Sequence, residues 1–261
     1  MLAEQRHQLI LRALRFGGTV TVTELSDQLG ASAATIRRDL LKLEEDGLLT
    51  RVHGGALVRR PSAEEGPTPF AESADVRVDE KDAIAAEAAT MIKDGQSIIL
   101  DSGTTVYQLA RQLHGRQLTV ITNNLVVYEE LAQEESIELM LLGGMVIRES
   151  RSLDGFMTEN HLRHVHADWL FMGACGIRSG GQVMDTTVNE VPARRAMIAA
   201  SDKVVLLADT GKFPGTGMVK ICDPEDLDAV VTNTSSDTAT CTALEEAGVT
   251  VIRTAPATIS A

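Results

Sequence analysis

The chain has 261 residues, a length that predicts two domains of ordinary size rather than one. Its composition is that of a globular protein, with 44% hydrophobic and 23% charged residues, and an aromatic content of 3% argues against stacking of single-stranded nucleic acid on aromatic rings. The formal net charge is -13, but residues 1–60 hold nine Lys and Arg against seven Asp and Glu, so a slightly basic N-terminal part precedes an acidic remainder.

Membrane, disulfide and metal chemistry have no basis in the sequence. No apolar run approaches the ~18 residues of a membrane span, and the charged N-terminus does not fit a signal peptide, so we expect a cytoplasmic protein with no membrane partner. Cys175, Cys222 and Cys241 are odd in number and lack CxxC spacing, which predicts buried free thiols rather than disulfides or a zinc site. The histidines of the stretch HLRHVH are expected in surface or capping positions. No cofactor or metal is implied.

The first 60 residues predict three short helices followed by a hairpin. Apolar residues at helical spacing precede Gly17-Gly18, which is expected to end the first helix. Thr23 is predicted to cap a second helix over 24–29, and Ser32 is predicted to cap a third after a tight glycine turn. Two short apolar segments then flank His53-Gly54-Gly55, a pattern typical of a β wing. Together these elements predict a winged helix-turn-helix.

The third helix of this unit begins SAATIRRDL, and in a helix-turn-helix this end of the second motif helix reads the major groove. Because its apolar residues form one buried face, Arg37 and Arg38 are expected on the exposed flank, where guanidinium groups can bind guanine or phosphate. The alternative is a solvated face on which the arginines pair with Asp39 and Glu44. The candidate DNA-binding residues are Ser32, Thr35, Arg37, Arg38, Arg51, His53, Gly54 and Gly55.

Residues 59–75 contain three prolines and show no periodicity, which predicts a linker between a winged helix-turn-helix domain at 1–58 and a second domain at 76–255. Predicted strands and helices alternate in the second domain. The strands are expected at 97–100, 118–121, 138–142, 168–172, 203–208, 229–232 and 250–252, and the helices at 78–92, 104–113, 126–132, 189–200 and 238–247. This alternation predicts an α/β fold with a mainly parallel sheet covered by helices on both faces.

Several polar loops follow the predicted strands. The stretch Asp101-Ser102-Gly103-Thr104-Thr105 lies where a strand ends and a helix begins, and the N–H groups of a helix N-terminus form an anion site that suits phosphate. An ordinary capped turn is the alternative. Because loops that follow parallel strands converge, Asn123-Asn124 is expected to read sugar hydroxyls, Gly143-Gly144 to allow close backbone approach, and Lys212 to approach an anion. The candidate effector-binding residues are Asp101, Ser102, Gly103, Thr104, Thr105, Asn123, Asn124, Gly143, Gly144, Asp154, Glu190 and Lys212, with Arg148, Arg151, Arg194 and Arg195 as further polar candidates.

The stretch VTELSDQLGASAATIRRDLLKLEEDGLLTRVHGGA, residues 22–56, resembles the N-terminal signature of the DeoR family of bacterial transcriptional regulators. The segments DSGTT, TNN, LLGG, ADWLFMGACGI and ADTGKF are similar, more loosely, to the C-terminal sensor domain of that family. The resemblance implies a DNA-contacting unit at 20–39, a wing tip at 53–55, and a sensor fold related to ribose-5-phosphate isomerase-like enzymes. It also implies a phosphorylated sugar or related metabolite as effector, with residues 101–105 and Lys212 in its pocket.

The sequence therefore predicts a DNA-binding transcriptional regulator, a repressor of a sugar-catabolism operon whose operator affinity is controlled by a phosphorylated sugar or related metabolite. The expected partners are double-stranded operator DNA, the effector and further copies of the chain in a homodimer or homotetramer. No enzymatic activity is expected. One alternative is a sugar-phosphate isomerase or deaminase with an accessory DNA-binding domain, for which Asp101, Glu190, Asp209 and Lys212 are plausible residue types. Another is a protein-interaction adaptor that uses the wing.

Overall fold

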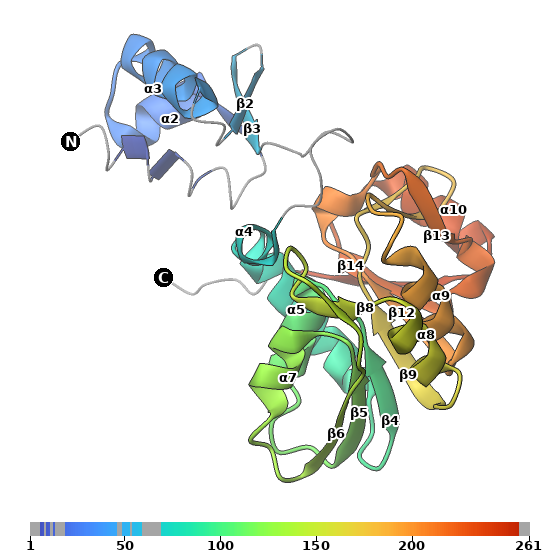
Figure 1. The fold of residues 1–261 in the computed structure, drawn as a ribbon. Helices are drawn as coiled ribbons and strands as arrows, with labels where there is room; N and C mark the ends of the chain where they lie inside the picture. Colours follow the sequence, from blue (N-terminus) through green and yellow to red (C-terminus); the bar gives the residue numbers. More distant parts are fainter. Residues whose placement is uncertain are drawn as a thin grey trace. The chain divides into compact units, whose positions relative to one another are not determined.

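The computed structural model describes residues 6, 7, 9, 10, 13, 19–45, 49–52, 54–58 and 69–255. The chain divides into two compact units, one of Met1–Glu64 with Asp75–Arg77 and the other of Glu65–Ala74 with Val78–Ala261. We call the first unit the head and the second the body (Figure 1). The predicted helix stop at Gly17-Gly18 and the predicted wing residue His53 lie outside the described residues.

The head contains the predicted helices and wing. Helix α2 (Val22–Leu29) and helix α3 (Ala33–Glu45) precede a hairpin of β2 (Leu49–Val52) and β3 (Gly55–Val58). A strand that the sequence did not predict, β1 (Thr19–Thr21), pairs with β3 to give an antiparallel sheet in the order β1-β3-β2. Apolar residues of every one of these elements meet in one core, in which Leu25, Ile36 and Leu40 are almost completely buried. The helix-turn-helix and the wing are therefore held together by one core.

The predicted cap of α2 is wrong. Thr21, rather than Thr23, occupies the cap position: the N–H of Glu24 donates to Thr21 Oγ1 at 3.2 Å, and the N–H of Thr21 donates to the Glu24 carboxylate at 2.8 Å. This reciprocal pair is a capping box, which satisfies two backbone donors at once. Helix α2 therefore begins at Val22, which is buried in the core of the head.

Seven strands form the central sheet of the body in the order β15-β14-β12-β9-β4-β5-β6, and all neighbours are parallel. The strands are β4 (Ser97–Leu100), β5 (Leu118–Thr122), β6 (Ile137–Leu141), β9 (Ala167–Met172), β12 (Ser201–Leu207), β14 (Ala229–Asn233) and β15 (Thr250–Thr254). The chain proceeds from β4 toward one edge of the sheet and from β9 toward the other. The loops after β4 and β9 therefore lie at the switch point of the topology, where ligands of open α/β sheets bind.

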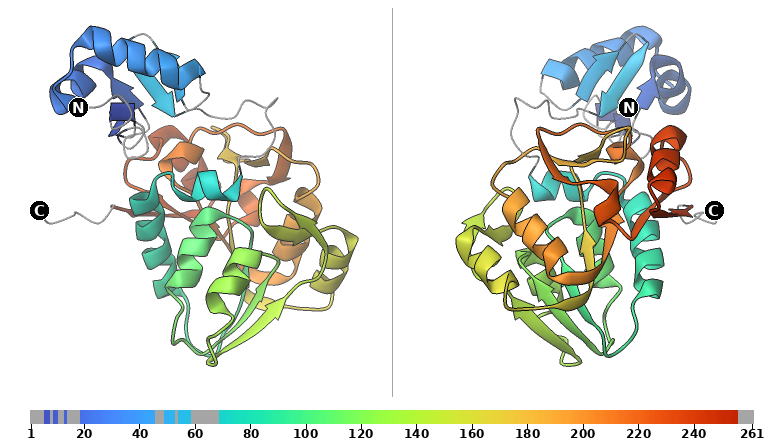
Figure 2. Two further views of the ribbon diagram at one scale, coloured as in Figure 1. Left: turned by 60° about the vertical axis from the view of Figure 1, so that its left-hand side comes forward. Right: turned by 90° about the vertical axis from the view of Figure 1, so that its right-hand side faces the viewer.

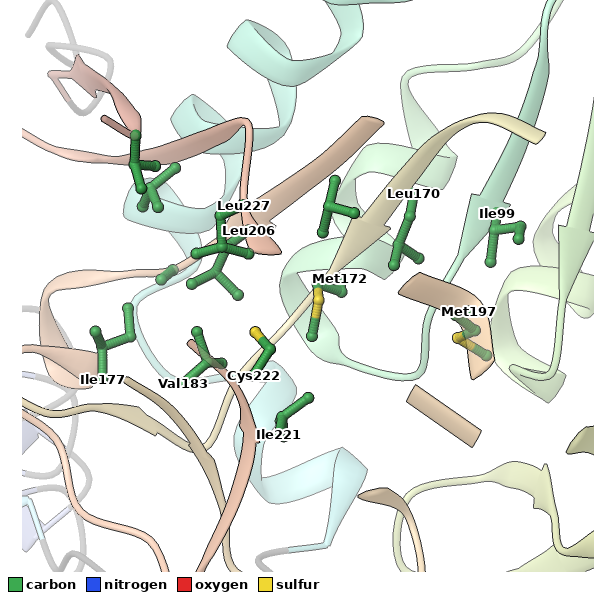
Figure 3. Packing of buried hydrophobic residues seen from close by; sticks show 14 of the residues in the cluster. Ile99, Leu170, Met172, Ile177, Val183, Met197, Leu206, Ile221, Cys222 and Leu227 are labelled. Carbon is green, nitrogen blue, oxygen red and sulfur yellow. The ribbon is translucent and has the colours of Figure 1, made fainter. Parts of the chain in front are cut away.

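Helices cover both faces of this sheet, and the predicted α/β class is confirmed. One face packs against α5 (Val78–Met91), α6 (Thr104–Arg111) and α7 (Leu125–Leu131), and the other against α8 (Phe156–Leu162), α9 (Val191–Ala199) and α10 (Thr238–Glu246). Alternate residues of a strand enter opposite cores, as with Ile98 and Ile99 of β4. Figure 3 shows part of the second core, in which Met197 of α9 lies beside Leu170 and Met172 of β9.

Several short elements were not predicted from the sequence. They are α4 (Phe70–Ala74), β7 (Met145–Ile147), β8 (Ser152–Asp154), α8, β10 (Gly176–Ile177), β11 (Val183–Asp185), η1 (Thr210–Lys212), β13 (Val219–Cys222) and η2 (Pro224–Asp226). Strands β7 and β8 form a hairpin, and β10, β11 and β13 form a small antiparallel sheet. Helix α4 lies within the segment 59–75 that was predicted to be a linker. It was not predicted because a helix of 5 residues is too short to give a periodic signal. Among the described residues, no helix is long and apolar enough to cross a membrane.

Candidate functional sites

The exposed flank of α3 presents two arginines. Ile36 is fully buried and orients this helix toward the core of the head, so the neighbouring Arg37 and Arg38 extend into solvent. The exposed residues at 33 and 34, before the arginines, are both alanines. At the start of the helix, the N–H of Thr35 donates to Ser32 Oγ at 3.2 Å, which is the predicted cap. Small side chains beside two guanidinium groups leave space for a close approach to DNA.

The side chain of Asp39 in α3 is hydrogen-bonded to Arg6 and His7, near the start of the chain. Its carboxylate accepts hydrogen bonds from Nε and Nη2 of Arg6 at 2.6 and 2.9 Å, and Oδ1 lies 3.1 Å from His7 Nε2. Burial raises the pKa of Asp39, but the bonds from Arg6 and His7 have the larger combined effect and hold that pKa below its usual range. This carboxylate thus fixes α3 against the start of the chain.

Glu44 of α3 is engaged by the wing. Its carboxylate accepts a hydrogen bond from the N–H of Arg51 at 3.1 Å and lies 3.7 Å from Nη1 of the same residue. Among the described residues, Arg37 and Arg38 have neither an ion pair nor a hydrogen bond through their side chains. The alternative of a helix face neutralised by Asp39 and Glu44 is therefore not the observed arrangement, and both guanidinium groups remain available to an external anion.

The wing glycines differ in their surroundings. Gly54 is exposed at the turn with φ of 90°, and its carbonyl accepts a hydrogen bond from the N–H of Val22 at 2.8 Å. Gly55 is buried, and a Cβ atom there would overlap the backbone of Val20 in β1. Gly55 therefore allows the wing to pack against β1, whereas Gly54 lies at the solvent-exposed tip.

Asp101 joins the two strands at the switch point of the body. It is the first residue after β4 and is fully buried. Its N–H donates to the carbonyl of Phe171 in β9 at 3.1 Å, and its Oδ2 accepts from the N–H of Gly173 at 3.2 Å. The predicted loop at 101–105 thus begins at the point where the two halves of the sheet diverge.

Arg194 of α9 is buried among three carboxylates. Its Nε lies 3.2 Å from Asp101 Oδ2, its Nη1 pairs with Asp185 at the end of β11, and its Nη2 lies 3.4 Å from Glu190 Oε2. Nη2 also donates to Ser102 Oγ at 3.4 Å. The side chain of Arg194 is 8% exposed. All of its guanidinium nitrogens therefore bind groups of the same chain.

The charges of this cluster are unequal, because one cation faces several acids. Burial raises the pKa of Asp101 and of Glu190, and Arg194 only partly opposes that rise. Burial also raises the pKa of Asp154 in β8, which is 3% exposed. Burial acts to lower the pKa of Arg194, but the carboxylates keep it well above its ordinary value, so the guanidinium stays charged. The cluster is thus a polar, acidic environment suited to hydroxyl groups.

The N-terminus of α6 follows this cluster directly and has no side-chain cap. Gly103 is the cap residue, with φ of 152°, and no side chain accepts a hydrogen bond from the first turn. Helix α7 differs, because Asn124 Oδ1 accepts from the N–H groups of Val126 and Val127 at 2.8 and 3.3 Å. Uncapped N–H groups at a helix N-terminus attract anions. The predicted loop at 101–105 therefore retains donors that a phosphate group can accept.

The amides after β5 bind mainly the protein itself. Asn124 caps α7, and Asn123 Nδ2 donates to the carbonyl of Leu153 at 3.0 Å. Asn123 Oδ1 is buried and has no hydrogen-bond partner. Of the two amides expected to read sugar hydroxyls, Asn123 thus retains a free acceptor, whereas Asn124 has a structural role.

The paired glycines after β6 pack against the hairpin and α8. Thr158 Oγ1 donates to the carbonyl of Gly143 at 2.9 Å, and a Cβ on Gly144 would lie 2.7 Å from the carbonyl oxygen of Asp154. The close backbone approach predicted for these glycines is therefore an approach to their own chain. This packing places Asp154 beside the loop after β6.

Lys212 is the last residue of η1, which follows β12. It is partly exposed and has no ion-pair partner among the described residues. Asp209 caps η1, with Oδ1 accepting from the N–H of Gly211 at 2.8 Å. In the sheet, β12 is separated from β4 by β9 alone, which corresponds to about 10 Å between the two strands. The loops that hold Lys212 and Asp101 therefore both follow strands in the central part of the sheet.

Sequence reasoning missed Asp185 and gave Arg194 no role. Asp185 is 1% exposed and binds the N–H and Oγ1 of Thr187 as well as Arg194. Its only signal in the sequence is a polar DTT after the apolar pair at 183 and 184.

Cys175 is partly buried, with its sulfur 3.5 Å from Asp185 Oδ1, whereas Cys222 and Cys241 are buried as expected. Among the described residues, no group of His, Cys, Asp and Glu forms a candidate metal site.

Two family models match the chain. The model described as the DeoR-like helix-turn-helix domain matches residues 6–61, and the model described as the DeoR C terminal sensor domain matches residues 76–234. The HTH-type transcriptional regulator GolR of Listeria innocua is 36% identical over 252 residues, which cover 96% of this chain and 98% of that protein. The glycerol-3-phosphate regulon repressor of Escherichia coli K12 is 32% identical over 234 residues, covering 89% of this chain and 92% of that protein.

Solved structures resemble the chain more distantly. A translation initiation factor eIF-2B from Pyrococcus horikoshii OT3 has a TM-score of 0.48 and 16% identity, and the match covers 87% of this chain and 94% of that one. Ribose 5-phosphate isomerase A from Methanocaldococcus jannaschii has a TM-score of 0.38 and 19% identity, and the match covers 51% of this chain and 52% of that one.

Proposed function

Because the chain belongs to the DeoR family of transcriptional regulators, we propose that its head binds operator DNA and that its body binds a phosphorylated sugar or a related metabolite that controls the affinity for DNA. In this proposal the protein is a repressor of a sugar-catabolism operon. The name of the E. coli relative, a glycerol-3-phosphate regulon repressor, supports an effector that carries phosphate.

The observation that carries the DNA-binding part is the exposure of Arg37 and Arg38 on α3 without ion-pair partners among the described residues. A guanidinium group loses affinity for an external anion when a carboxylate of the same protein already binds it. Asp39 and Glu44 instead bind Arg6 and Arg51. The proposed DNA-binding residues are Ser32, Thr35, Arg37, Arg38, Arg51, His53, Gly54 and Gly55, with Gly55 acting through the packing of the wing.

The uncapped N-terminus of α6 supports the effector part of the proposal. Its N–H groups and the amine of Lys212 are the proposed phosphate ligands, because Arg194 already binds three carboxylates. The acidic cluster around Arg194 is the proposed site for the hydroxyl groups of the sugar. The proposed effector-binding residues are Asp101, Ser102, Gly103, Thr104, Thr105, Asn123, Asn124, Gly143, Gly144, Asp154, Glu190 and Lys212, with Asn124, Gly143 and Gly144 acting through the packing of their loops.

The proposed DNA site also implies more than one copy of the chain. Helix-turn-helix proteins bind two half-sites related by the two-fold symmetry of the protein, about one turn of DNA apart. A homodimer or homotetramer would provide two α3 helices for one operator. We propose no catalytic role, because Asp101 and Glu190 bind Arg194, and Asp209 caps η1.

The experiment is fluorescence anisotropy on a duplex that the full-length protein selects from a random DNA pool, at one stated salt concentration. Glycerol 3-phosphate, glucose 6-phosphate and ribose 5-phosphate are added in turn, with glycerol, glucose and ribose as matched controls. We expect at least one phosphate to change the affinity by about 5- to 150-fold and its unphosphorylated partner to have no effect. Failure to select any duplex would contradict the DNA-binding part. Equal affinities with every phosphate and its control would contradict the effector part.

A further inference from the structure

We call residues 70–81, where the predicted linker ends and α5 begins, the joining segment; residues 75–77 group with the head and the others with the body. It comprises α4 and the first turn of α5. Phe70 is 9% exposed and Lys81 is 2% exposed, and Lys81 Nζ donates to the carbonyl of Ser73 at 2.6 Å. This bond connects α4 to the first turn of α5. Figure 2 gives two further views of these helices, coloured by position in the sequence.

Phe70 connects the joining segment to two elements of the proposed effector site. Its ring contacts the ring of Tyr107 in α6 edge to face, with centroids 6.0 Å apart. The N–H of Tyr107 donates to the carbonyl of Gly103, the uncapped N-terminal residue of that helix. The N–H of Phe70 donates at 2.7 Å to the carbonyl of Glu149, in the turn of the hairpin whose second strand ends at Asp154.

Glu80 connects the joining segment to a third element of that site. Its carboxylate accepts hydrogen bonds from the N–H and Oγ1 of Thr210 at 3.1 and 2.7 Å, and Thr210 begins η1, which ends at Lys212. The carbonyl of Glu80 also accepts from Asn233 Nδ2 at 3.2 Å, at the end of β14. Residues that are close together in the sequence thus contact helix α6, the hairpin and η1, the element that ends at Lys212.

From these contacts we propose that the joining segment couples the effector site to the head, with Phe70 and Glu80 as its positioning residues. The inference rests on the proposed function. All residues before position 70 are connected to α5 through this segment, so a shift of α6, the hairpin and η1 on effector binding displaces α4 and the start of α5, to which the rest of the N-terminal chain is attached. Packed elements transmit such shifts because they are not freely deformable.

The test uses the reciprocity of coupled sites. If the effector changes the affinity for DNA, then DNA changes the affinity of the effector site by the same factor. The probe is the duplex that the full-length wild-type protein selects from a random pool, so no effector is needed. Hydrogen exchange is followed in peptides covering 101–107, 145–154 and 209–213, with and without that duplex. In the wild type we expect the duplex to change exchange in all three peptides by about fivefold or more.

Variants at each positioning residue separate the three connections. With Phe70→Ala we expect the change to disappear at 101–107 and 145–154 and to persist at 209–213. With Glu80→Ala we expect the opposite pattern. The matched controls are Glu72→Ala, at an exposed position of α4, and Glu87→Ala, two turns further along α5, both of which should behave as the wild type. A merely structural role would alter exchange without this selectivity.

The outcomes separate the inference from the function on which it rests. Failure of the wild type to select a duplex would contradict the proposed function. Selection of a duplex without a change in the three peptides, or changes that persist in both variants, would overturn the inference alone. If Phe70→Ala does not fold, Glu80→Ala decides, because its hydrogen bonds to Thr210 lie at a partly exposed site where a substitution is tolerated.

Discussion

Arg37 and Arg38 of the head extend into solvent without ion-pair partners among the described residues, whereas Arg194 of the body is buried against Asp101, Asp185 and Glu190. The same side chain therefore has two different roles in one protein. In the head the guanidinium groups are available to a polyanion such as DNA. In the body the guanidinium compensates carboxylates that would otherwise be buried without a counter-charge.

This difference determines where an anion can bind in the body. A phosphate group that competed for Arg194 would leave three carboxylates without their cation, which is unfavourable in a buried site. The N–H groups at the start of α6 and the amine of Lys212 have no such commitment among the described residues. In the proposed effector site, the groups that would bind phosphate are thus different from the group that compensates the buried carboxylates.

The largest expected effect is that of removing the buried cation. Arg194→Met should lower the free energy of unfolding of the body by about 3–5 kcal/mol, because it leaves buried carboxylates without their partner. Trp169, in β9, is the single tryptophan of the chain, so its fluorescence in a urea titration reports the unfolding of the body. The matched control is Arg195→Met, at an exposed residue that donates to backbone carbonyls, which should change this free energy by less than about 1 kcal/mol.

If Arg194→Met and Arg195→Met lower the free energy of unfolding equally, Arg194 does not stabilise the body by compensating buried carboxylates. Arg194→Lys refines the test, because it keeps the charge and loses the planar donor array. We expect its stability to lie between those of the wild type and of Arg194→Met.

The next effect concerns the exposed arginines. Arg37→Ala or Arg38→Ala should weaken binding to the selected duplex by about 1–3 kcal/mol each, if the residue forms a bidentate contact with a base. The unfolding of the body, followed through Trp169, should not change. Gln28→Ala, at an exposed position of α2, is the control for a general effect of substitution in the head. Wild-type affinity in the double arginine variant would exclude this flank of α3 from the DNA interface.

Much of the fold could be predicted from the sequence because its signals are local. Most strands of the sheet are apolar runs that are buried in the structure, and each predicted strand overlaps an observed one, including the more exposed edge strands β6 and β15. The cap of α2 was misassigned although the sequence carries a signal for it, because Thr21 is followed three residues later by Glu24, the spacing of a capping box, whereas Thr23 is followed by Ser26. Elements of two to five residues, such as α4 and β10, are too short to show any period.

The candidate sites were predictable to a different extent in the two domains. In the head, the contact residues of a helix-turn-helix lie within one short helix, so the stretch TIRRDL carries the signal by itself. In the body, Asp101, Asp185 and Arg194 are separated by up to 93 positions and meet only after the sheet has formed. The sequence therefore identified the loop at 101–105 but could not show which cation compensates it.

A smaller effect is expected at Lys212. Lys212→Ala should lower the affinity for the phosphorylated compound that acts on the wild type by roughly tenfold, which is the size of one charge-assisted hydrogen bond. The affinity for the selected duplex without that compound should stay at the wild-type value. Lys220→Ala is the matched control, because Lys220 is exposed and pairs with Asp223 at 2.5 Å. An unchanged titration with Lys212→Ala would leave the α6 N-terminus as the proposed phosphate site and exclude the lysine.

The smallest effect tests the acidic character of the body through pH. Burial raises the pKa of Glu190 above its ordinary value of 4.5, so the folded protein keeps this proton at pH values where the unfolded chain has lost it. The stabilisation from this group is complete below pH 4.5 and is lost as the pH rises through the raised pKa. Glu190→Gln cannot ionise, so its stability relative to the wild type should increase as the pH rises above 4.5 and level off above the raised pKa, by about 1.4 kcal/mol for each unit by which the pKa is raised. Urea titrations followed by Trp169 fluorescence measure this difference, with Glu135→Gln, at an exposed position, as the control. A difference that does not vary with pH would mean that Arg194 offsets the cost of burying the Glu190 carboxylate, so that its pKa is not raised.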